Sequence, residues 1–199
     1  LGKFRIEFIK TNHSIQDASA LAIYSPAGIV VHTGDFKVDY TPVFGDAIDL
    51  QRFAEIGKKG VLALMSDSTN AERPGFTQSE RTVGATFDRL FAEHSNTRII
   101  VATFASNVDR VQQIINTSYK YGRKVVVEGR SMVNIISVAS ELGYLNVPEN
   151  TLIETDQLKN YPREKTTIIT TGSQGESMAA LSRMAANIHK KVSIKPGDT

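Results

Sequence analysis

One stretch organises the chain, residues 30–37, which read Val30-Val31-His32-Thr33-Gly34-Asp35-Phe36-Lys37. The apolar β-branched residues predict a strand, and the Thr-Gly pair predicts a turn that leaves Asp35 at the strand's end. Earlier in the chain, His13 lies in the polar loop Asn12-His13-Ser14. A strand-end carboxylate and a loop imidazole can ligate a divalent metal, so His13 and Asp35 are candidate metal ligands.

The composition is that of a globular protein. The chain has 199 residues, of which 41% are hydrophobic and 22% are charged, and this is enough to bury a sizeable core. The absence of cysteine excludes disulfides and thiolate ligands, so any metal must be held by His, Asp, Glu or water. The net charge of +2 does not by itself indicate nucleic-acid binding, although a local basic groove is compatible with it.

Targeting signals are not evident in the sequence. No apolar run approaches the ~18 residues of a membrane span, and the first residues lack the layout of a signal peptide. We therefore expect a cytoplasmic protein with no membrane partner. The chain begins with Leu1 and ends with the turn Lys195-Pro196-Gly197-Asp198-Thr199, from which we expect an internal piece of a longer protein.

The first sixty residues predict mainly strands. Residues 4–10 alternate like a half-buried strand, and apolar runs at 20–25 and 29–33 flank the turn Ser25-Pro26-Ala27-Gly28, which predicts a β-hairpin. A short helix is expected from Asp49 to the glycines and lysines at 57–60.

From Val61 onward the pattern changes to strand, turn and helix, repeated. Apolar strands are predicted at 61–65, 99–102, 125–127 and 167–171, and amphipathic helices are predicted between and after them. Capping boxes at 77–80 and 106–109 predict two helix starts, and Met178, Leu181, Met184 and Ile188 predict a last helix. The fold class is therefore α/β, with a mainly parallel sheet flanked by helices. The best boundary, near Pro74-Gly75, separates residues 1–75 from residues 76–199.

The loops that follow the predicted strands are small, hydroxylated or glycine-rich. Ligands bind at the carboxyl ends of parallel strands, and three of these loops precede a helix N-terminus, which favours anions. We therefore expect a phosphate-like ligand. The candidate residues for this ligand are Ser68, Ser106, Asn107, Arg130, Ser131, Gly172, Ser173, Gln174 and Gly175, and Asp67 in the same set of loops is a candidate active-site carboxylate.

Each candidate also has a plainer interpretation. Ser106 alone is more often only an N-cap, and Gly172–Gly175, which matches neither the Walker pattern nor GxGxxG, is also typical of a tight turn. Arg130 either binds a phosphate or pairs with a carboxylate. Asp67 is either an active-site carboxylate or a turn former.

The remaining histidines are less promising as ligands. His32 lies within an apolar strand and is expected in the core, whereas His94 and His189 are expected to meet solvent. The sequence contains no HExxH, no CxxC and no nucleophile elbow, so proteases, zinc fingers and α/β-hydrolases gain no support.

Six motifs follow one another along the chain, at residues 12–17, 32–37, 66–70, 102–107, 129–132 and 171–176. In this order they resemble the bacterial ribonuclease J family, β-CASP members of the metallo-β-lactamase superfamily. The resemblance covers nearly the whole chain. It implies that residues 1–75 are the end of a first metallo-β-lactamase segment, a partial sheet, and that residues 76–199 are most of a β-CASP domain.

The resemblance also implies a chemistry. His13 matches a metal ligand of the superfamily, Asp35 the aspartate that bridges two metal ions, and Asp67 the acidic residue of the first β-CASP motif. Such enzymes use two zinc or manganese ions to activate a water that attacks an RNA phosphodiester, which makes Asp35 and Asp67 the catalytic candidates. The implied activities are 5′-to-3′ exonuclease and endonuclease in RNA processing and decay, by a parent protein that is a dimer or tetramer. The phosphate candidates outside the metal site would then contact RNA.

The chain also departs from the family. It contains neither the HxHxDH motif, which supplies most of the metal ligands, nor the later β-CASP histidines. With two of the expected ligands, we expect the chain by itself neither to cleave RNA nor to bind metal tightly. Two alternatives remain open, a small-molecule hydrolase, which the α/β part argues against, and a non-catalytic scaffold that binds the RNA backbone.

Overall fold

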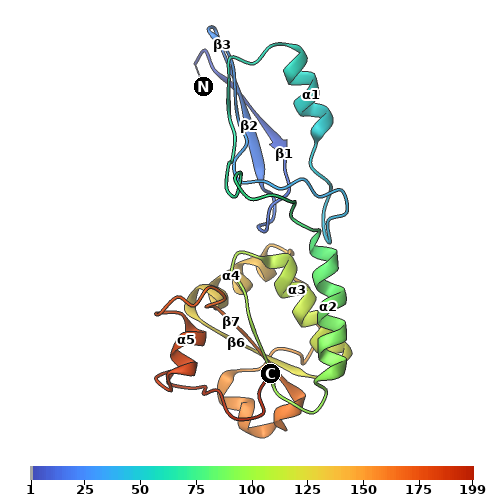
Figure 1. Ribbon diagram of the computed structural model, residues 1–199, viewed down its shortest axis with the longest axis vertical. Coiled ribbons are helices and arrows are strands. Elements are labelled where there is room, and N and C mark those ends of the chain that lie inside the picture. Colours follow the sequence, from blue (N-terminus) through green and yellow to red (C-terminus); the bar gives the residue numbers. More distant parts are fainter. Residues whose placement is uncertain (1) are drawn as a thin grey trace. The chain divides into compact units, whose positions relative to one another are not determined.

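The computed structural model describes residues 2–199, and its internal contacts divide the chain into two compact units. The first unit extends to Arg81 and the second runs from Thr82 to Thr199, so the division falls a few residues after the predicted boundary. Each unit has a sheet of its own (Figure 1). Each also has its own hydrophobic core.

The first unit contains a four-stranded sheet in the order β1-β2-β3-β4. Strands β1 (Arg5–Lys10), β2 (Ser19–Ser25) and β3 (Gly28–His32) are antiparallel, which confirms the predicted hairpin. Strand β4 (Ala63–Met65) pairs in parallel with β3. This parallel pair places the carboxyl ends of β3 and β4 at the same edge of the sheet.

One face of this sheet is covered by helix α1 (Leu50–Lys58), whose N-cap Asp49 accepts a hydrogen bond from the Arg52 amide. Side chains alternate across a strand, so every second residue points to that face. The covered core consists of Ile9, Ala20, Ala22, Val31 and Ile56.

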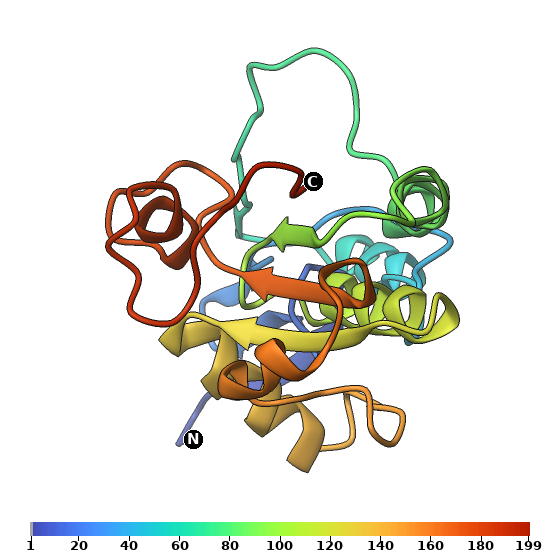
Figure 2. The same cartoon turned by 90° about the horizontal axis from the view of Figure 1, so that it is seen from below.

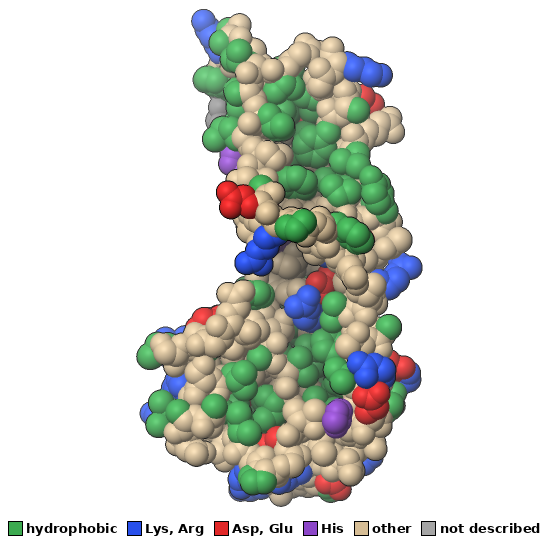
Figure 3. Space-filling view, in the orientation of Figure 1, with side chains coloured by type: hydrophobic (Ala, Val, Ile, Leu, Met, Phe, Trp, Pro, Cys, Tyr) green, Lys and Arg blue, Asp and Glu red, His purple; other side chains and the backbone are tan. Residues whose placement is uncertain are grey.

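The opposite face carries exposed hydrophobic side chains. Phe8 is 74% exposed, and Met65 of β4 is 56% exposed. The prediction of a continuous apolar strand over 61–65 is therefore wrong in extent, because β4 has three residues and forms an edge. The prediction that His32 lies in the core is also wrong, because His32 is the cross-strand partner of Met65 and is exposed, as Met65 is. Figure 3 shows hydrophobic side chains, in green, on the surface of this unit.

The second unit contains a parallel sheet in the order β5-β7-β6, seen in Figure 2. The strands are β5 (Ile99–Ala102), β6 (Lys124–Glu128) and β7 (Thr166–Thr170). The helices are α2 (Glu80–Glu93), α3 (Val108–Lys120), α4 (Arg130–Glu141) and α5 (Ala180–Ala185), with short 3-10 helices η1 (Thr155–Asn160) and η2 (Arg163–Lys165). The predicted parallel sheet flanked by helices is confirmed.

Both faces of this sheet are buried. Ile99, Val125 and Ile169 pack with residues of α2, α3 and α4 in the larger cluster. Their sequence neighbours Val126 and Ile168 point the other way and pack with Ala180 and Met184 of α5. Burial on both faces explains why these strands are continuous apolar or Thr-rich runs without an alternating pattern.

Three predicted helix boundaries are wrong. Helix α2 begins at Glu80, later than the capping box at Thr77 predicts. The N-cap of α3 is Asn107 and not Ser106. The Asn107 side chain accepts a 3.1 Å hydrogen bond from the Arg110 amide, and asparagine is as good an N-cap as serine. Helix α5 spans six residues, so Met178 and Ile188 lie outside it and are 83% and 65% exposed.

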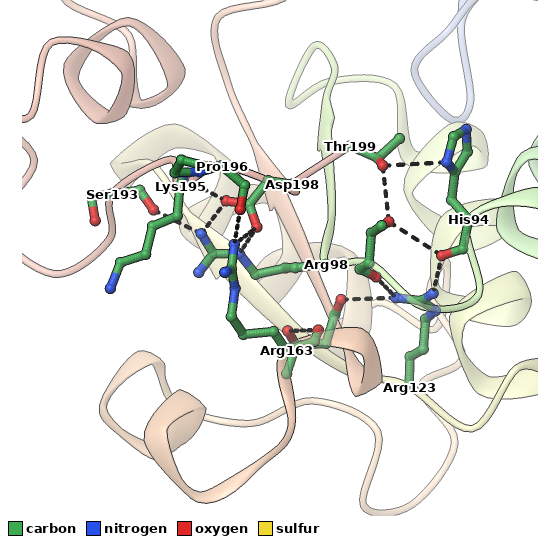
Figure 4. Close-up of polar contacts among 11 residues, drawn as sticks. His94, Arg98, Arg123, Arg163, Ser193, Lys195, Pro196, Asp198 and Thr199 are labelled. Carbon is green, nitrogen blue, oxygen red and sulfur yellow. Dashed lines mark hydrogen bonds and ion pairs between the residues drawn. The ribbon is translucent and has the colours of Figure 1, made fainter.

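A buried ion-pair cluster holds the last residues of the chain beside β5 (Figure 4). The Asp198 side chain is 2% exposed and accepts hydrogen bonds from Arg98, from Arg163 at 2.5 Å and from the Lys195 amide at 2.8 Å. Burial acts to raise the pKa of Asp198, but these hydrogen bonds outweigh it and hold the pKa below its usual range. Thr199 extends the contact, because its amide donates to the Arg98 carbonyl at 2.9 Å.

Replacing Asp198 by alanine should destabilise the second unit by about 3–5 kcal/mol, because it leaves the buried Arg98 guanidinium without its carboxylate. Urea denaturation followed by circular dichroism measures this loss. The matched control is Asp88→Ala, which removes an exposed pair with Lys120 and should change the midpoint little. Equal midpoints for the two variants would contradict the assigned importance of the Asp198 cluster.

A second ion pair ties β1 to α1 and should make the first unit sensitive to acid. Arg52 donates to Glu7 at 2.5 and 3.0 Å and Tyr24 donates to it at 2.8 Å, which lowers the pKa of Glu7 from 4.5 to about 2. A carboxylate with a lowered pKa stabilises the fold above its unfolded pKa, and this stability is lost as the pH falls from 4.5 toward 2. Glu7→Gln should therefore be less stable than the natural chain near neutral pH, with the difference shrinking toward pH 2. Thermal denaturation across this range measures it, and a difference that does not depend on pH would refute the expectation.

Candidate functional site

The predicted turn after β3 is built around Thr33, which links the ends of two strands. The Thr33 amide donates to the Met65 carbonyl at 3.0 Å and continues the parallel pairing of β3 with β4. The Thr33 hydroxyl accepts a 2.9 Å hydrogen bond from the Asp67 amide. Gly34 then adopts φ +61°, a conformation that favours glycine, and the chain turns into Asp35.

Asn12 connects the loop of His13 to two other segments. It is 8% exposed, and its carbonyl accepts from the Lys37 amide at 2.8 Å. Its side chain accepts from the Ile48 amide at 2.7 Å and donates to the Asp46 carbonyl at 2.9 Å. The loops at 12, 37 and 46–48 are therefore held together by one buried side chain and its backbone.

These links bring His13 close to Asp35. His13 Nε2 lies 3.9 Å from Asp35 Oδ2, and the Ser14 hydroxyl contacts His13 Nδ1 at 3.1 Å. The Asp35 side chain is 78% exposed and the His13 side chain is 34% exposed, so both can reach a ligand from solvent.

Asp67 lies within electrostatic range of His13. Its pKa is lowered, first by the hydrogen bond that it accepts from the Thr69 amide at 2.8 Å, and further by the Phe36 amide and the charge of His13. Asp67 therefore holds its own loop as a turn former would and also lies close enough to His13 for their charges to interact. The two interpretations of Asp67 are compatible in this geometry.

The donors fit a hard or borderline divalent ion in kind. Zinc ligands lie about 2.0–2.2 Å from the ion, so two of them on one tetrahedral ion are about 3.4 Å apart. The His13 to Asp35 distance of 3.9 Å exceeds that separation by an amount that side-chain rotation can remove. Within residues 2–199, no group of three or more His, Asp or Glu side chains is placed to hold a metal ion.

In the second unit, the phosphate candidates lie at the carboxyl ends of β5, β6 and β7. Gly129, with φ +106°, sits so close to Thr171 that a Cβ on Gly129 would lie 2.9 Å from the Thr171 hydroxyl. The loops after β6 and β7 therefore meet, and Arg130 and Ser131 line one pocket with Thr171. Ser173, Gln174 and Gly175 are exposed.

The other two candidates in this unit, Ser106 and Asn107, follow β5. Asn107 is 3% exposed and its side chain caps α3, whereas Ser106 is partly exposed and does not form the cap. Ser68 is exposed in the first unit, next to Asp67.

His189 is not at the solvent, contrary to the prediction. Its side chain is 9% exposed, and its Nε2 lies 3.4 Å from Glu128 Oε2 at the end of β6. His189 Nδ1 accepts from the Val192 amide at 3.2 Å. The adjacent lysines indicated an exposed segment, but the imidazole folds back under the loop after α5.

Sequence reasoning also missed Asn12, Thr33 and Arg183. Asn12 and Thr33 support the candidate ligands through hydrogen bonds with distant partners, and no local pattern reveals such partners. Arg183 lines the same pocket as Arg130, but a lone arginine in an amphipathic segment gives no functional signal.

Comparison with known proteins gives the family. Residues 96–199 match the model of the family described as "Ribonuclease J, beta-CASP domain". This chain belongs to the ribonuclease J family. The match covers the parallel sheet of the second unit with helices α3, α4 and α5, and it begins after helix α2.

Curated members of the ribonuclease J family are similar along the whole chain. Ribonuclease J of Helicobacter pylori strain J99 is 50% identical over 198 residues, which are 100% of this chain and 28% of that protein. Ribonuclease J of Synechocystis is 49% identical over 100% of this chain and 31% of its own length. Ribonuclease J2 of Bacillus subtilis is 44% identical over 98% of this chain and 35% of its own length. The chain thus spans about a third of the length of these relatives.

A solved structure shares the fold. The crystal structure of a protein of unknown function from Enterococcus faecalis V583 superposes with a TM-score of 0.59 and 20% sequence identity. It covers 87% of this chain, which corresponds to 43% of that protein. Among the helices of residues 2–199, none has the length and hydropathy needed to cross a membrane.

Asn12→Ala should destabilise the first unit by about 2–4 kcal/mol, because it leaves the Ile48 amide and the Asp46 carbonyl without partners. Asn12→Asp keeps the acceptor for the Ile48 amide but sets a buried carboxylate oxygen against the Asp46 carbonyl, so it should also destabilise the unit. Chemical denaturation of both variants measures the series. Unchanged stability of Asn12→Ala would show that the three loops do not depend on this side chain.

Proposed function

We propose that the full-length protein that carries this chain is a metal-dependent ribonuclease that hydrolyses RNA phosphodiester bonds. Membership of the ribonuclease J family supports the proposal, and the approach of His13 to Asp35 at the ends of β1 and β3 is the observation that carries it. By the same reasoning, residues 1–75 belong to a metallo-β-lactamase segment and residues 76–199 to the β-CASP domain.

In this proposal, His13 and Asp35 hold metal. Contact of Ser14 with His13 Nδ1 leaves Nε2 free for a ligand bond, as an orienting hydrogen bond does at metal-bound histidines. The exposed Asp35 carboxylate has two oxygens and suits a bridging position between two ions. Zinc or manganese bound there would supply a water activated for attack near neutral pH.

The residues around the ligands then position them. The hydrogen bonds that lower the pKa of Asp67 favour its ionised form and make its carboxylate a weak base, so its role next to His13 is to accept hydrogen bonds and to add negative charge. Thr33 fixes the Asp67 backbone through the Asp67 amide, which leaves this carboxylate at the metal edge. Asp35 and Asp67 are thus the proposed catalytic residues.

RNA is the proposed partner, and its backbone would contact the loops after the parallel strands. Ser68, Ser106, Arg130, Ser131 and the 172–175 loop offer hydroxyl, guanidinium and amide donors there, while Asn107 supports the α3 start. We further propose combined 5′-to-3′ exonuclease and endonuclease activity in RNA processing and decay, a cytoplasmic location and a homo-oligomeric state.

Asp35→Asn in the full-length protein should lower RNA hydrolysis by at least about 100-fold, because it replaces the carboxylate that binds the metal. Loss of a residue that only hydrogen-bonds to a metal ligand typically costs about 10- to 100-fold, and loss of a ligand itself should cost more. Cleavage of a 5′-labelled RNA measures the rate, and bound metal is measured by mass spectrometry. The control is Asp156→Asn, which changes an 80% exposed carboxylate that pairs with Lys191 at the surface. Normal cleavage by Asp35→Asn would refute the assignment of Asp35 as a metal ligand. If the natural protein bound RNA but did not cleave it, the alternative of a non-catalytic scaffold that binds the RNA backbone would be favoured.

A further inference from the structure

A pocket of about 650 Å³ lies at the carboxyl ends of β6 and β7. Its walls include Gly129, Arg130 and Ser131 from the start of α4, and Thr171, Ala179 and Arg183 from the segment after β7. The pocket belongs entirely to the second unit. It is distinct from the candidate metal residues, which lie in the first unit.

Two arginines in this pocket are available for an anion. Arg130 is exposed and Arg183 is half-buried, and neither guanidinium has an ion pair or side-chain hydrogen bond to any residue of the described part of the chain. Most of the buried or paired arginines of this unit, such as Arg98 and Arg123, are instead saturated by carboxylate or carbonyl oxygens. A planar guanidinium with free donors suits a phosphate oxygen pair.

Two carboxylates, Glu128 and Glu176, also line the pocket, and neither forms an ion pair with the two arginines within residues 2–199. Glu128 accepts a 2.5 Å hydrogen bond from the Thr155 hydroxyl and pairs with His189 on its other oxygen. Glu176 accepts from the Gln174 amide at 3.1 Å within its own loop. Both carboxylates are therefore engaged by groups other than the two arginines.

The walls of the pocket add a second kind of contact. Helix α4 starts at Arg130, its N-cap Gly129 provides no side-chain cap, and its first turn has no acidic residue, so its amides reinforce the attraction for an anion. Met178, also in the wall, is 83% exposed and offers an apolar surface. A ligand with both an anionic group and a flat apolar group matches this combination.

We propose that this pocket is a subsite for one nucleotide of a single-stranded RNA, with its phosphate held between Arg130 and Arg183 and its base against Met178. The inference rests on the proposed function for the choice of RNA. It adds Arg183 and Met178 to the residues expected to bind substrate, and it assigns Arg130 to the same phosphate as Arg183.

The test measures RNA binding by fluorescence anisotropy with a labelled single-stranded RNA at several salt concentrations. The full-length protein is used with Asp35→Asn so that the RNA stays intact. Arg183→Gln and Arg130→Gln should each weaken binding about 10-fold, as loss of a charge-assisted hydrogen bond does. Each should also reduce the slope of log K against log salt by about 0.7, the value for one phosphate contact on a single strand. Met178→Ala should weaken binding without changing this slope.

The matched control is Arg89→Gln, which removes an exposed arginine of α2 that pairs with Glu93 and should leave affinity and slope unchanged. The subsite would be overturned if Arg130→Gln and Arg183→Gln both bound RNA with the affinity and salt slope of the natural protein. It would also be overturned if Arg89→Gln lost as much affinity as they do. Binding of a free nucleoside monophosphate that the arginine variants abolish, with RNA binding unaffected, would overturn the assignment to an RNA strand. The proposed nuclease function is tested separately, by measuring RNA cleavage with the natural full-length protein. Absence of cleavage there would count against the nuclease function and not against the subsite.

Discussion

The candidate metal site depends on the way Thr33 joins the ends of two parallel strands. Its amide extends the pairing of β3 with β4, and its hydroxyl receives the amide of Asp67. Parallel strands finish at the same edge of a sheet, so a polar residue just beyond each strand is brought to one place. Thr33 makes that placement specific, because it fixes where the chain leaves each strand. Asp35 and Asp67, which are 32 residues apart in the sequence, are brought into one set of connected loops in this way.

In both units, buried polar side chains hold loops in place through hydrogen bonds and ion pairs. Asn12 satisfies the backbone of the 46–48 segment in the first unit, and Asp198 gathers Arg98 and Arg163 in the second. A buried polar group without its partner costs free energy, so each pairing favours one loop arrangement over others. The loops that carry the candidate ligands are thus supported by residues that themselves need not touch a ligand.

Much of the fold could be predicted from the sequence, because burial leaves a periodic pattern. Apolar runs marked β5, β6 and β7, since these strands are buried on both faces, and helical spacing marked α3 and α4. The errors arose where a neighbour distant in sequence decides the outcome. Met65 and His32 have apolar or strand-like contexts yet face an uncovered side of the sheet, and His189 is buried by Glu128 from a strand sixty residues earlier. Asn107 took the cap predicted for Ser106 because both residues can cap, and only the backbone turn at 104–107 decides between them.

The central claim is that His13 and Asp35 are ligands of one metal centre. Anomalous X-ray diffraction from crystals of the full-length protein grown with manganese tests it most directly. We expect a strong anomalous peak about 2.0–2.3 Å from both His13 Nε2 and an Asp35 carboxylate oxygen. A manganese ion bound elsewhere, with His13 and Asp35 both outside its coordination sphere, would contradict the claim.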